Sequence, residues 1–426
     1  MKQPRLFILA IIATCAFLPT TRMQAASTST DRINAIQEAL RAEKLDGWLF
    51  YDFRGSDPLA LRVLLLDEDA VGSRRWFYFI PARGECCKIV HRIEAAKLAS
   101  LPGRQIEYSS WRELHAALRA ALPNEKRKIA MQYSPMNDIP YLARVDAGTI
   151  ELVRSFGMEI VSSAELVQQF EAVWSPEQLQ SHLTASEKMH RIFFDAFREI
   201  ARRIRAKEPT TEYDIEQFIL RRWHEEGMIG HDAIVSVNAN TANPHYVPTR
   251  EKALPIRRGD FVLLDLASKL KQPDDAVFTD QTWTGYVGEE VPEEYTRIFD
   301  IVREARDAAV SFVRENIRAG KSIRGGEVDD VARGIISRAG YGEYFTHRTG
   351  HSIGEEVHGN GVNIDNFETR DSRRITPGVC FSIEPGIYQK GKFGVRSEVD
   401  VYVQDNNIQV TGQPIQTAVV PILKLE

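Results

Sequence analysis

The chain has 426 residues, of which 43% are hydrophobic and 27% are charged, and its formal net charge is −5. This composition is that of a globular protein, and the length exceeds what one hydrophobic core usually fills, so we expect two domains. The acidic balance and the lack of a long lysine- or arginine-rich tract argue against nucleic acid and anionic membrane surfaces as partners.

The first 26 residues have the pattern of a secretory signal peptide. A short basic start precedes an apolar run from Leu6 to Leu18, and polar, helix-breaking residues follow. A membrane-spanning helix needs about 20 apolar residues, so this run is too short to cross a bilayer. We expect cleavage near Ala25 or Ala26, a secreted or periplasmic protein, and no membrane span after cleavage. The alternative is a buried first helix.

The chain contains four cysteines, of which Cys15 would leave with the signal segment. The other three are too few for a disulfide framework, and no pair has the Cys-x-x-Cys spacing of a zinc site. We therefore interpret Cys86, Cys87 and Cys380 as packing residues.

Residues 27–172 alternate short strands with helices, which predicts a layered α/β domain. After a first capped helix, we expect strands at Trp48–Tyr51, Trp76–Ile80, Lys88–His91, Ile106–Tyr108 and Ile129–Tyr133, and helices near Glu94–Ser100 and Trp111–Leu122. Neither His91 nor His115 lies near a cluster of other reactive groups, so we expect structural roles for both.

Residues 173–426 form the second expected domain, which begins at a strong helix start. Ser175 is a good N-cap, Pro176 suits the first helical position and Gln178 completes a capping box. The pattern then predicts helices to about Lys207 and from about Thr210, strands at His231–Val237, Phe261–Ala267 and Val277–Thr282, and helices from Pro292 to Gly320 and over Glu327–Ala339. Strands and turns follow. Helices and strands grouped in this way predict an α+β layer with helices on one face.

Two aspartates lie in neighbouring predicted strands. Asp265 interrupts an apolar strand, and Asp280 lies in the next strand-like run. The turn residues Pro273, Asp274 and Asp275 between them predict a hairpin, which would bring the two aspartates close together. Each aspartate taken alone could equally face solvent.

Three histidines, His347, His351 and His358, fall within twelve residues of a chain that has ten histidines in all. The glycine-rich sequence around them predicts a tight loop, so their convergence depends on backbone turns. Further along the chain, Glu384 ends an apolar strand just before a turn, and Glu398 lies in an alternating strand.

Taken singly, these acids could be solvated surface groups, but together they make chemical sense. Four carboxylates and one imidazole suit two divalent cations of hard character, with Mn²⁺ or Co²⁺ ahead of Zn²⁺. Carboxylates can bridge, so five side chains suffice for two cations about 3.5–4 Å apart. Water held between two cations becomes hydroxide near neutral pH and can attack a carbonyl.

At these residues the sequence resembles the creatinase/aminopeptidase P/prolidase superfamily, the pita-bread metallopeptidases, and in particular the Xaa-Pro dipeptidases (prolidases). Three strings match the family pattern, and the likeness covers nearly the whole mature chain: residues 349–354, 383–388 and 394–398. The resemblance implies an α/β N-terminal creatinase-like domain and an α+β pita-bread catalytic domain. It also implies five metal ligands: Asp265, Asp280, His351, Glu384 and Glu398.

The resemblance further implies three catalytic residues. Glu384 would act as general base on the attacking water and then as proton donor to the leaving proline nitrogen. His358 would stabilise the tetrahedral intermediate together with the cations. His245 would contact the peptide near the scissile bond.

Other residues are expected to bind substrate. The resemblance places His347 in the substrate pocket, and Arg370 and Arg396 where a guanidinium could bind the free carboxylate that follows proline. His231 stands where many relatives have a tyrosine, and we include it among the substrate-binding residues.

The sequence departs from the family pattern at three more places. The first ligand is not followed by the usual small residue and glycine, and Trp283 replaces a usual arginine. The loop between the two aspartates is longer than usual, so Asp274 or Asp275 could compete with Asp280 as the second ligand. We prefer Asp280 because its surroundings keep the family's spacing of acid and threonines.

The function implied is hydrolysis of the Xaa-Pro bond of dipeptides, with short proline-containing peptides as substrates and a homodimer as the assembly. The alternatives are an Xaa-Pro aminopeptidase acting on longer peptides, and a non-peptidase or catalytically silent relative with the same fold. The complete ligand set argues against the last two. A methionine aminopeptidase is disfavoured because those enzymes usually lack this N-terminal domain.

Overall fold

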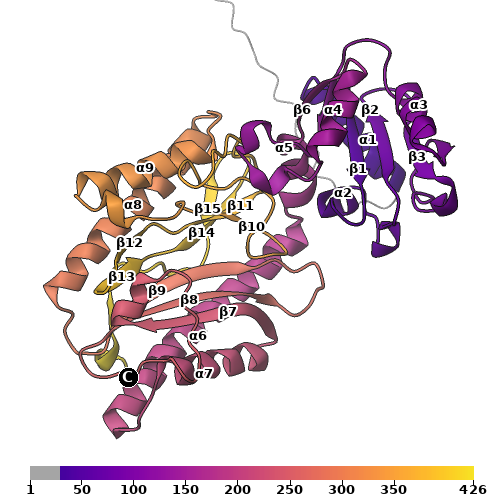
Figure 1. Cartoon of the computed structure of the whole chain (residues 1–426). Helices are drawn as coiled ribbons and strands as arrows, with labels where there is room; N and C mark the ends of the chain where they lie inside the picture. The colour runs from indigo at the N-terminus through magenta and orange to yellow at the C-terminus, as the bar shows by residue number, and fades with distance from the viewer. Residues whose placement is uncertain (1–28) are drawn as a thin grey trace, which may run out of the picture.

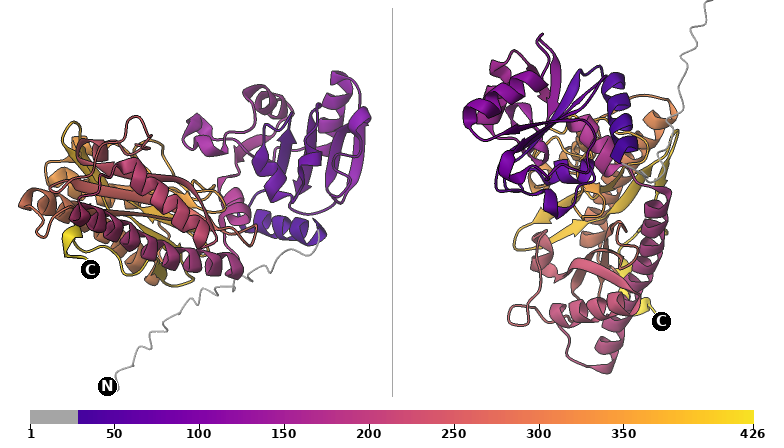
Figure 2. Two further views of the ribbon diagram at one scale, coloured as in Figure 1. Left: turned by 90° about the horizontal axis from the view of Figure 1, so that it is seen from below. Right: turned by 90° about the vertical axis from the view of Figure 1, so that its right-hand side faces the viewer.

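The computed structural model describes residues 29–426, so the expected signal segment 1–26, with Cys15, lies outside the described part of the chain. Figure 1 shows a smaller part built around one sheet and a larger part in which strands lie between two pairs of helices. The left view in Figure 2 shows the same two parts side by side. That they are independent domains divided between residues 172 and 173 stays a prediction.

The smaller part is a six-stranded mixed sheet covered by helices on both faces. The strands are β1 (Gly47–Asp52), β2 (Trp76–Pro81), β3 (Cys87–His91), β4 (Arg104–Tyr108), β5 (Lys128–Met131) and β6 (Glu159–Ser162), in the order β4-β3-β2-β1-β5-β6. Helices α1 (Ser29–Ala42), α2 (Pro58–Val63) and α5 (Ala164–Val167) pack on one face, and α3 (Trp111–Ala121) and α4 (Ala147–Ser155) on the other. Each face buries its own apolar cluster, as the predicted α/β layering requires.

The helix expected at Glu94–Ser100 is wrong. A single 3₁₀ turn at Arg92–Glu94 and further turns replace it. Pro102 disfavours helical backbone at the residue before it, and Gly103, with a φ of 104°, leads the chain into β4. Leu98 and Leu101 nevertheless pack into the core from these turns.

In the larger part, two helices cover one face of a sheet with three antiparallel strands and one short parallel edge strand. The capping box forms as expected: the Ser175 side chain accepts from the Gln178 N–H, and Gln178 accepts from the Ser175 N–H, at the start of α6 (Pro176–Ala206). Helix α7 (Glu212–Glu225) follows, then β7 (Met228–Val237), β8 (Phe261–Leu270) and β9 (Thr279–Tyr286), with the short β16 (Val420–Pro421) beside β9. Helices α6 and α7 share one apolar cluster with these strands.

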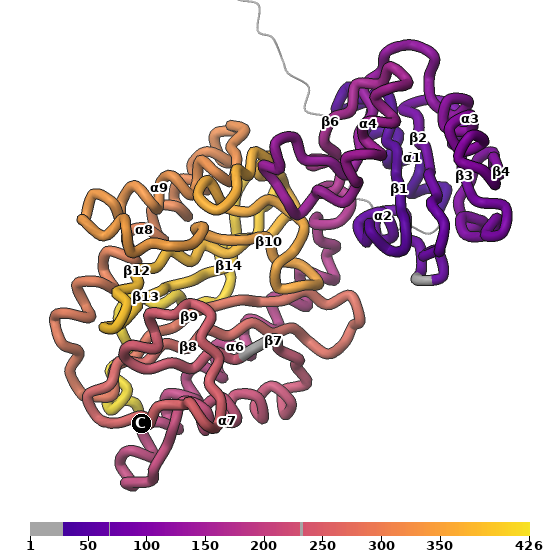
Figure 3. Tube along the Cα trace, in the orientation of Figure 1, coloured from indigo at the N-terminus to yellow at the C-terminus, as the bar shows by residue number. Residues whose placement is uncertain are grey.

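A second pair of helices covers the remaining strands. These helices are α8 (Glu293–Arg318) and α9 (Gly325–Arg338). The strands are β10 (Ser352–Ile353), β11 (Cys380–Ile383), β14 (Val399–Val403) and β15 (Ile408–Val410), which form one sheet, and the hairpin β12 (Gly386–Gln389) and β13 (Phe393–Arg396). The trace in Figure 3 shows the two strand groups next to each other, with both helix pairs on the outside. The inner surfaces are therefore left for polar side chains.

Three predictions about the described chain can be checked here. Cys86, Cys87 and Cys380 are free and buried, as expected of packing residues. His91 and His115 make ring contacts with neighbouring aromatic side chains, in keeping with structural roles. Among residues 29–426, no helix combines the length and the apolar content that crossing a bilayer requires.

Candidate metal centre

The two aspartates lie on a hairpin, as predicted. Strands β8 and β9 pair antiparallel, with Asp265 opposite Thr282 and Asp280 opposite Ala267. Side chains two residues apart on a strand share a face, so Asp265, Thr282 and Asp280 lie together on the inner surface of the sheet. Asp280 is 6% exposed, whereas Asp274 and Asp275 lie in the exposed connecting loop. The hairpin thus brings Asp265 and Asp280, and not their two competitors, to the inner surface.

His351 reaches the same place from the glycine-rich loop. Its Nε2 lies 3.5 Å from Asp280 Oδ2 and 3.4 Å from Glu384 Oε1. Gly350 allows this approach, because a Cβ at that position would lie 1.9 Å from the Ser382 carbonyl oxygen. The loop can therefore lie against β11 only with glycine at position 350.

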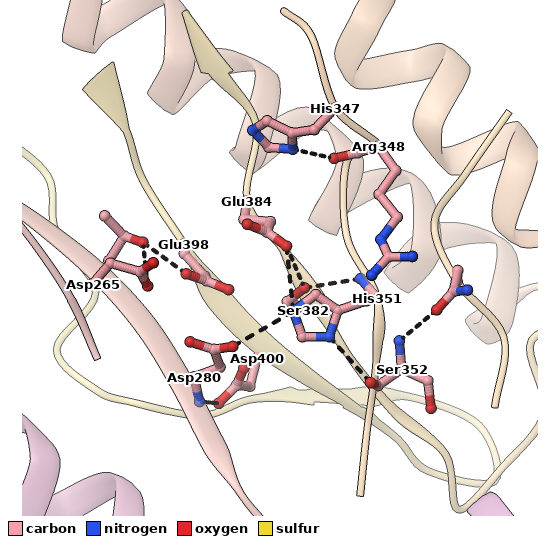
Figure 4. A network of polar contacts seen from close by, with 12 residues as sticks. Asp265, Asp280, His347, Arg348, His351, Ser352, Ser382, Glu384, Glu398 and Asp400 are labelled. Carbon is pink, nitrogen blue, oxygen red and sulfur yellow. Dashed lines mark hydrogen bonds and ion pairs between the residues drawn. The ribbon is translucent and has the colours of Figure 1, made fainter. Parts of the chain in front are cut away.

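The predicted ligands face one another in Figure 4. One ligand atom from each of Asp280, His351 and Glu398 lies within 4.8 Å of the others, which is the geometry of a group that could hold a metal ion. The Thr282 hydroxyl lies 3.1 Å from Asp265 Oδ1 and 2.7 Å from Glu398 Oε2. Through these contacts all five predicted ligands join one cluster.

Arg396 contributes a positive charge to the cluster. Its guanidinium forms an ion pair with Asp265 and donates from Nε to the Thr282 hydroxyl at 2.9 Å. Burial acts to lower the pKa of Arg396, but the carboxylates of Asp265, Glu384 and Glu398 outweigh it and raise that pKa well above its usual value. Arg396 is thus a permanent cation here, and its predicted role in binding the substrate carboxylate stays a prediction.

The cluster fits a divalent cation. Burial raises the pKa of Asp280, Glu384 and Glu398, and repulsion from neighbouring carboxylates adds to the effect. Glu398 Oε1 is buried and has no hydrogen-bond partner. Burial also lowers the pKa of His351, which favours the neutral imidazole that binds metals. A cation would neutralise the carboxylates and satisfy the orphaned oxygen.

Two further polar residues support the cluster and were not predicted. Asp400 Oδ2 accepts hydrogen bonds from the Asp280 N–H at 3.0 Å and from the Thr279 hydroxyl at 2.9 Å. The Ser382 hydroxyl accepts from the His351 N–H at 3.0 Å and donates to Glu384 Oε1 at 3.2 Å. Each lies two residues from a predicted ligand, so the two-residue period of strands could have found both.

The remaining histidines lie at different distances from the cluster. The rings of His358 and His351 are 4.4 Å apart, edge to face. His347 Nε2 lies 2.7 Å from the hydroxyl of Tyr388, to which Arg396 Nη1 also donates at 3.3 Å. His347 and His358, which come from the same glycine-rich loop as His351, thus lie against the cluster, while the side chain of His245 is exposed on the segment after β7.

Two predicted substrate-binding residues are not brought into the cluster by the contacts described above. Arg370 is exposed, and its backbone N–H donates to the Asp138 carbonyl of the smaller part at 3.0 Å. The backbone of His231 lies in β7, and its side chain is outside what the structure describes. Their roles stay predictions.

Known proteins identify the class to which this fold and centre belong. The chain is 33% identical over 246 residues to an Xaa-Pro dipeptidase of Lactobacillus helveticus, a match that covers 57% of this chain and 60% of the relative. Its fold is similar to that of a dipeptidase from Mycobacterium ulcerans, with a TM-score of 0.64, 23% identity, and coverage of 92% of this chain and 98% of the other. An X-Pro aminopeptidase from Thermotoga maritima has a TM-score of 0.57 and 22% identity over 91% of this chain and 99% of the other. The fold is that of the pita-bread metallopeptidases.

The sequence model of metallopeptidase family M24 matches residues 185–405, and the chain belongs to this family. The resemblance to the creatinase/aminopeptidase P/prolidase superfamily is thereby confirmed. The 246-residue match to the Lactobacillus helveticus dipeptidase covers 60% of that relative's length.

Proposed function

We propose that this protein is a two-metal peptidase that hydrolyses the Xaa-Pro bond of dipeptides. The observation that carries the proposal is the buried group of Asp280, His351 and Glu398, in which Glu398 Oε1 has no hydrogen-bond partner. Membership of family M24 and the similarity to an Xaa-Pro dipeptidase support the choice of reaction and substrate.

The five predicted ligands would hold two divalent cations, with Mn²⁺ as the proposed metal because four of the ligands are hard carboxylate oxygens. When bound, the cations would polarise the scissile carbonyl and lower the pKa of the attacking water. The chain's own residues would then bind the dipeptide, orient it and move the proton.

Glu384 would move the proton. Its Oε1 lies near His351 Nε2 and accepts from the Ser382 hydroxyl, so this oxygen is oriented, and burial raises the pKa of the carboxyl group. A carboxylate with a raised pKa is a better general base, and it would return the proton to the proline nitrogen as that nitrogen leaves. His358, beside His351, would donate to the oxygen that gains negative charge.

Arg396, His347 and Tyr388 would bind the far end of the dipeptide. They form one contact chain, in which Tyr388 links the guanidinium to the imidazole. Burial lowers the pKa of His347 to about 3, so its ring is neutral at physiological pH. The buried guanidinium would supply the positive charge for the substrate carboxylate.

The test is an assay of Xaa-Pro, Xaa-Pro-Yaa and Xaa-Ala peptides with the metal-free protein and with added Mn²⁺, Co²⁺ or Zn²⁺. We expect no activity without metal, restoration by Mn²⁺ or Co²⁺, and a preference for Xaa-Pro. Full turnover in a preparation shown to be metal-free by elemental analysis would refute the two-metal reaction. A preference for tripeptides would favour the second candidate, an Xaa-Pro aminopeptidase, which the fold of the Thermotoga maritima enzyme supports.

We also propose that the mature protein is a homodimer outside the cytoplasm. The family resemblance supports the assembly, and the pattern of residues 1–26 supports export. N-terminal sequencing and light scattering of the protein from its native host would test both statements.

A further inference from the structure

Glu212 carries a buried carboxylate that is no part of the metal cluster. Glu212 is the first residue of α7, and its side chain is fully buried. An isolated buried carboxylate is costly, so it must be hydrogen-bonded. Both of its oxygens accept hydrogen bonds, and none of these donors belongs to the helix that carries Glu212.

The donors come from one segment that is distant in sequence. Oε1 accepts from the Val237 N–H at 2.8 Å and the Asn240 side-chain amide at 2.9 Å. Oε2 accepts from the Tyr246 hydroxyl at 2.6 Å and the Leu254 N–H at 2.7 Å. These donors span the whole stretch from the end of β7 to Leu254, which carries His245.

The first half of this stretch has other attachments. The Asn238 side-chain amide donates to Asp260 at 2.8 Å, and Thr241 Oγ1 accepts from the Gly394 N–H at 2.7 Å. Residues 243–254 contain many exposed side chains, including His245 itself. A segment with so little buried apolar surface depends on its hydrogen bonds for a fixed position, and Glu212 accepts those of Tyr246 and Leu254.

A role in stabilising the start of α7 does not account for the hydrogen bonds that Glu212 accepts from residues 237–254. An acid in the first turn favours helix formation, but the cap of α7 is already complete. Thr211 accepts from the Asp214 N–H at 3.2 Å, and Asp214 accepts from the Thr211 N–H at 2.9 Å. The hydrogen bonds of Asp214 thus close the cap of α7 itself, while those of Glu212 reach outward to residues 237–254.

We propose that Glu212 is the positioning residue for His245. Its buried carboxylate holds residues 243–254 through Tyr246 and Leu254, and so sets where the imidazole meets the bound peptide. The inference rests on the proposed function for the role of His245, but the fixing of the segment is independent of it.

The structural part of the proposal is tested by hydrogen exchange in the metal-loaded protein. In Glu212→Gln, amide exchange across residues 243–254 should rise by about tenfold or more, while metal content stays that of the wild type. Tyr246→Phe removes one of the hydrogen bonds and should raise exchange in the same residues by a smaller factor. Asp214→Asn is the matched control in the same helical turn and should leave exchange there unchanged. Unchanged exchange in both Glu212→Gln and Tyr246→Phe, or an equal rise in Asp214→Asn, would overturn the proposal.

The catalytic part is tested by a double-mutant cycle on kcat/KM for an Xaa-Pro dipeptide. Glu212→Gln should lower kcat/KM by about tenfold in the wild type and by no more than about twofold in a His245→Ala background, because the first change acts through the second residue. Equal losses in both backgrounds would show that Glu212 does not act through His245. A wild type that cleaves no Xaa-Pro peptide would refute the proposed function, and the exchange experiment would still decide whether Glu212 fixes the segment.

Discussion

The carboxylates and the histidines of the candidate site reach it in different ways. Asp265 and Asp280 lie on paired strands, where ladder hydrogen bonds determine their positions, and Glu384 and Glu398 adjoin the paired residues Ile383 and Val399 of β11 and β14. The histidines come from loops and diverge: His351 enters the cluster, while His245 stays exposed. Strands fix which side chains meet, whereas a loop needs particular backbone contacts, such as the close approach at Gly350, to do the same.

The largest expected effect comes from a ligand on a strand. Asp280→Asn should lose one or both metals and nearly all activity, because an amide is a poorer ligand than a carboxylate for hard cations. Metal content by elemental analysis and turnover of an Xaa-Pro dipeptide are the measurements. Asp274→Asn and Asp275→Asn are matched controls in the exposed loop of the same hairpin and should keep both. The opposite ranking in a metal titration would mean that the second ligand lies in the loop.

Substitution of His358 and of His351, whose rings are in contact, should have different effects on metal content. His358→Ala should keep its metal and lose rate by about 10²-fold or more, the usual cost of removing an oxyanion stabiliser. His351→Ala should lose metal as well as rate, since its Nε2 lies between two carboxylates of the cluster. Elemental analysis and kcat for both variants provide the comparison. Equal metal loss in the two variants would make His358 a ligand.

The same contrast explains what could be predicted from the sequence. The capping box at Ser175, the β8–β9 hairpin and the convergence of its aspartates follow from local patterns, and all three appear in the structure. Strand periodicity also contained the signal for Ser382 and Asp400. Sequence patterns do not determine the pairing of the short strands β10 to β15, because their partners are distant along the chain.

Hydrogen bonds between segments that are distant along the chain also could not be predicted from local sequence patterns. The backbone donors to Glu212 lie 25 and 42 residues further along the chain, so nothing near Glu212 marks it as more than an acid in a first helical turn. In the same way, the ion pair of Arg396 with Asp265 joins residues 131 apart. Both contacts depend on the complete fold.

The stability of the protein should fall at acid pH because of a buried histidine in α6, the helix that packs against the β8–β9 hairpin. His182 of α6 is fully buried, with Nδ1 2.7 Å from the Phe278 carbonyl and Nε2 2.7 Å from the Thr411 hydroxyl. Burial lowers its pKa from 6.5 to about 4, against the opposing effect of the bond to Phe278. The neutral ring fits these partners, with Nδ1–H donating and Nε2 accepting.

The direction of the pH effect on stability follows from the difference in proton binding between the unfolded and the native state. The unfolded chain binds a proton at this histidine below pH 6.5 and the native state does not until about pH 4, so stability is complete above pH 6.5 and falls as the pH is lowered between these values. The loss in the free energy of unfolding should reach about 3 kcal/mol. Urea midpoints of the wild type and His182→Asn from pH 7 to pH 4 are the measurement. Equal pH dependence in both proteins would contradict the prediction.

The smallest effect concerns a loop residue that the structure leaves apart from the cluster. Arg370 is exposed, and the segment around it is held to the smaller part by its backbone bond to Asp138. If its guanidinium binds the carboxylate that follows proline, Arg370→Ala should raise KM for Xaa-Pro dipeptides by about tenfold, the value of one hydrogen bond to a charged group. Metal content should not change, since the variant removes no ligand.

Substrate length makes this prediction decisive. A tripeptide has no carboxylate directly after proline, so Arg370→Ala should narrow the preference for Xaa-Pro over Xaa-Pro-Yaa by raising KM for the dipeptide alone. Arg373→Ala is a poor control because that guanidinium is buried against Asp371, whereas the nearby Arg324 is exposed and not among the predicted binding residues. Arg324→Ala should leave both KM values unchanged. An unchanged dipeptide KM in Arg370→Ala would assign carboxylate binding to the buried Arg396 alone, and a wild type that prefers tripeptides would make the protein an Xaa-Pro aminopeptidase.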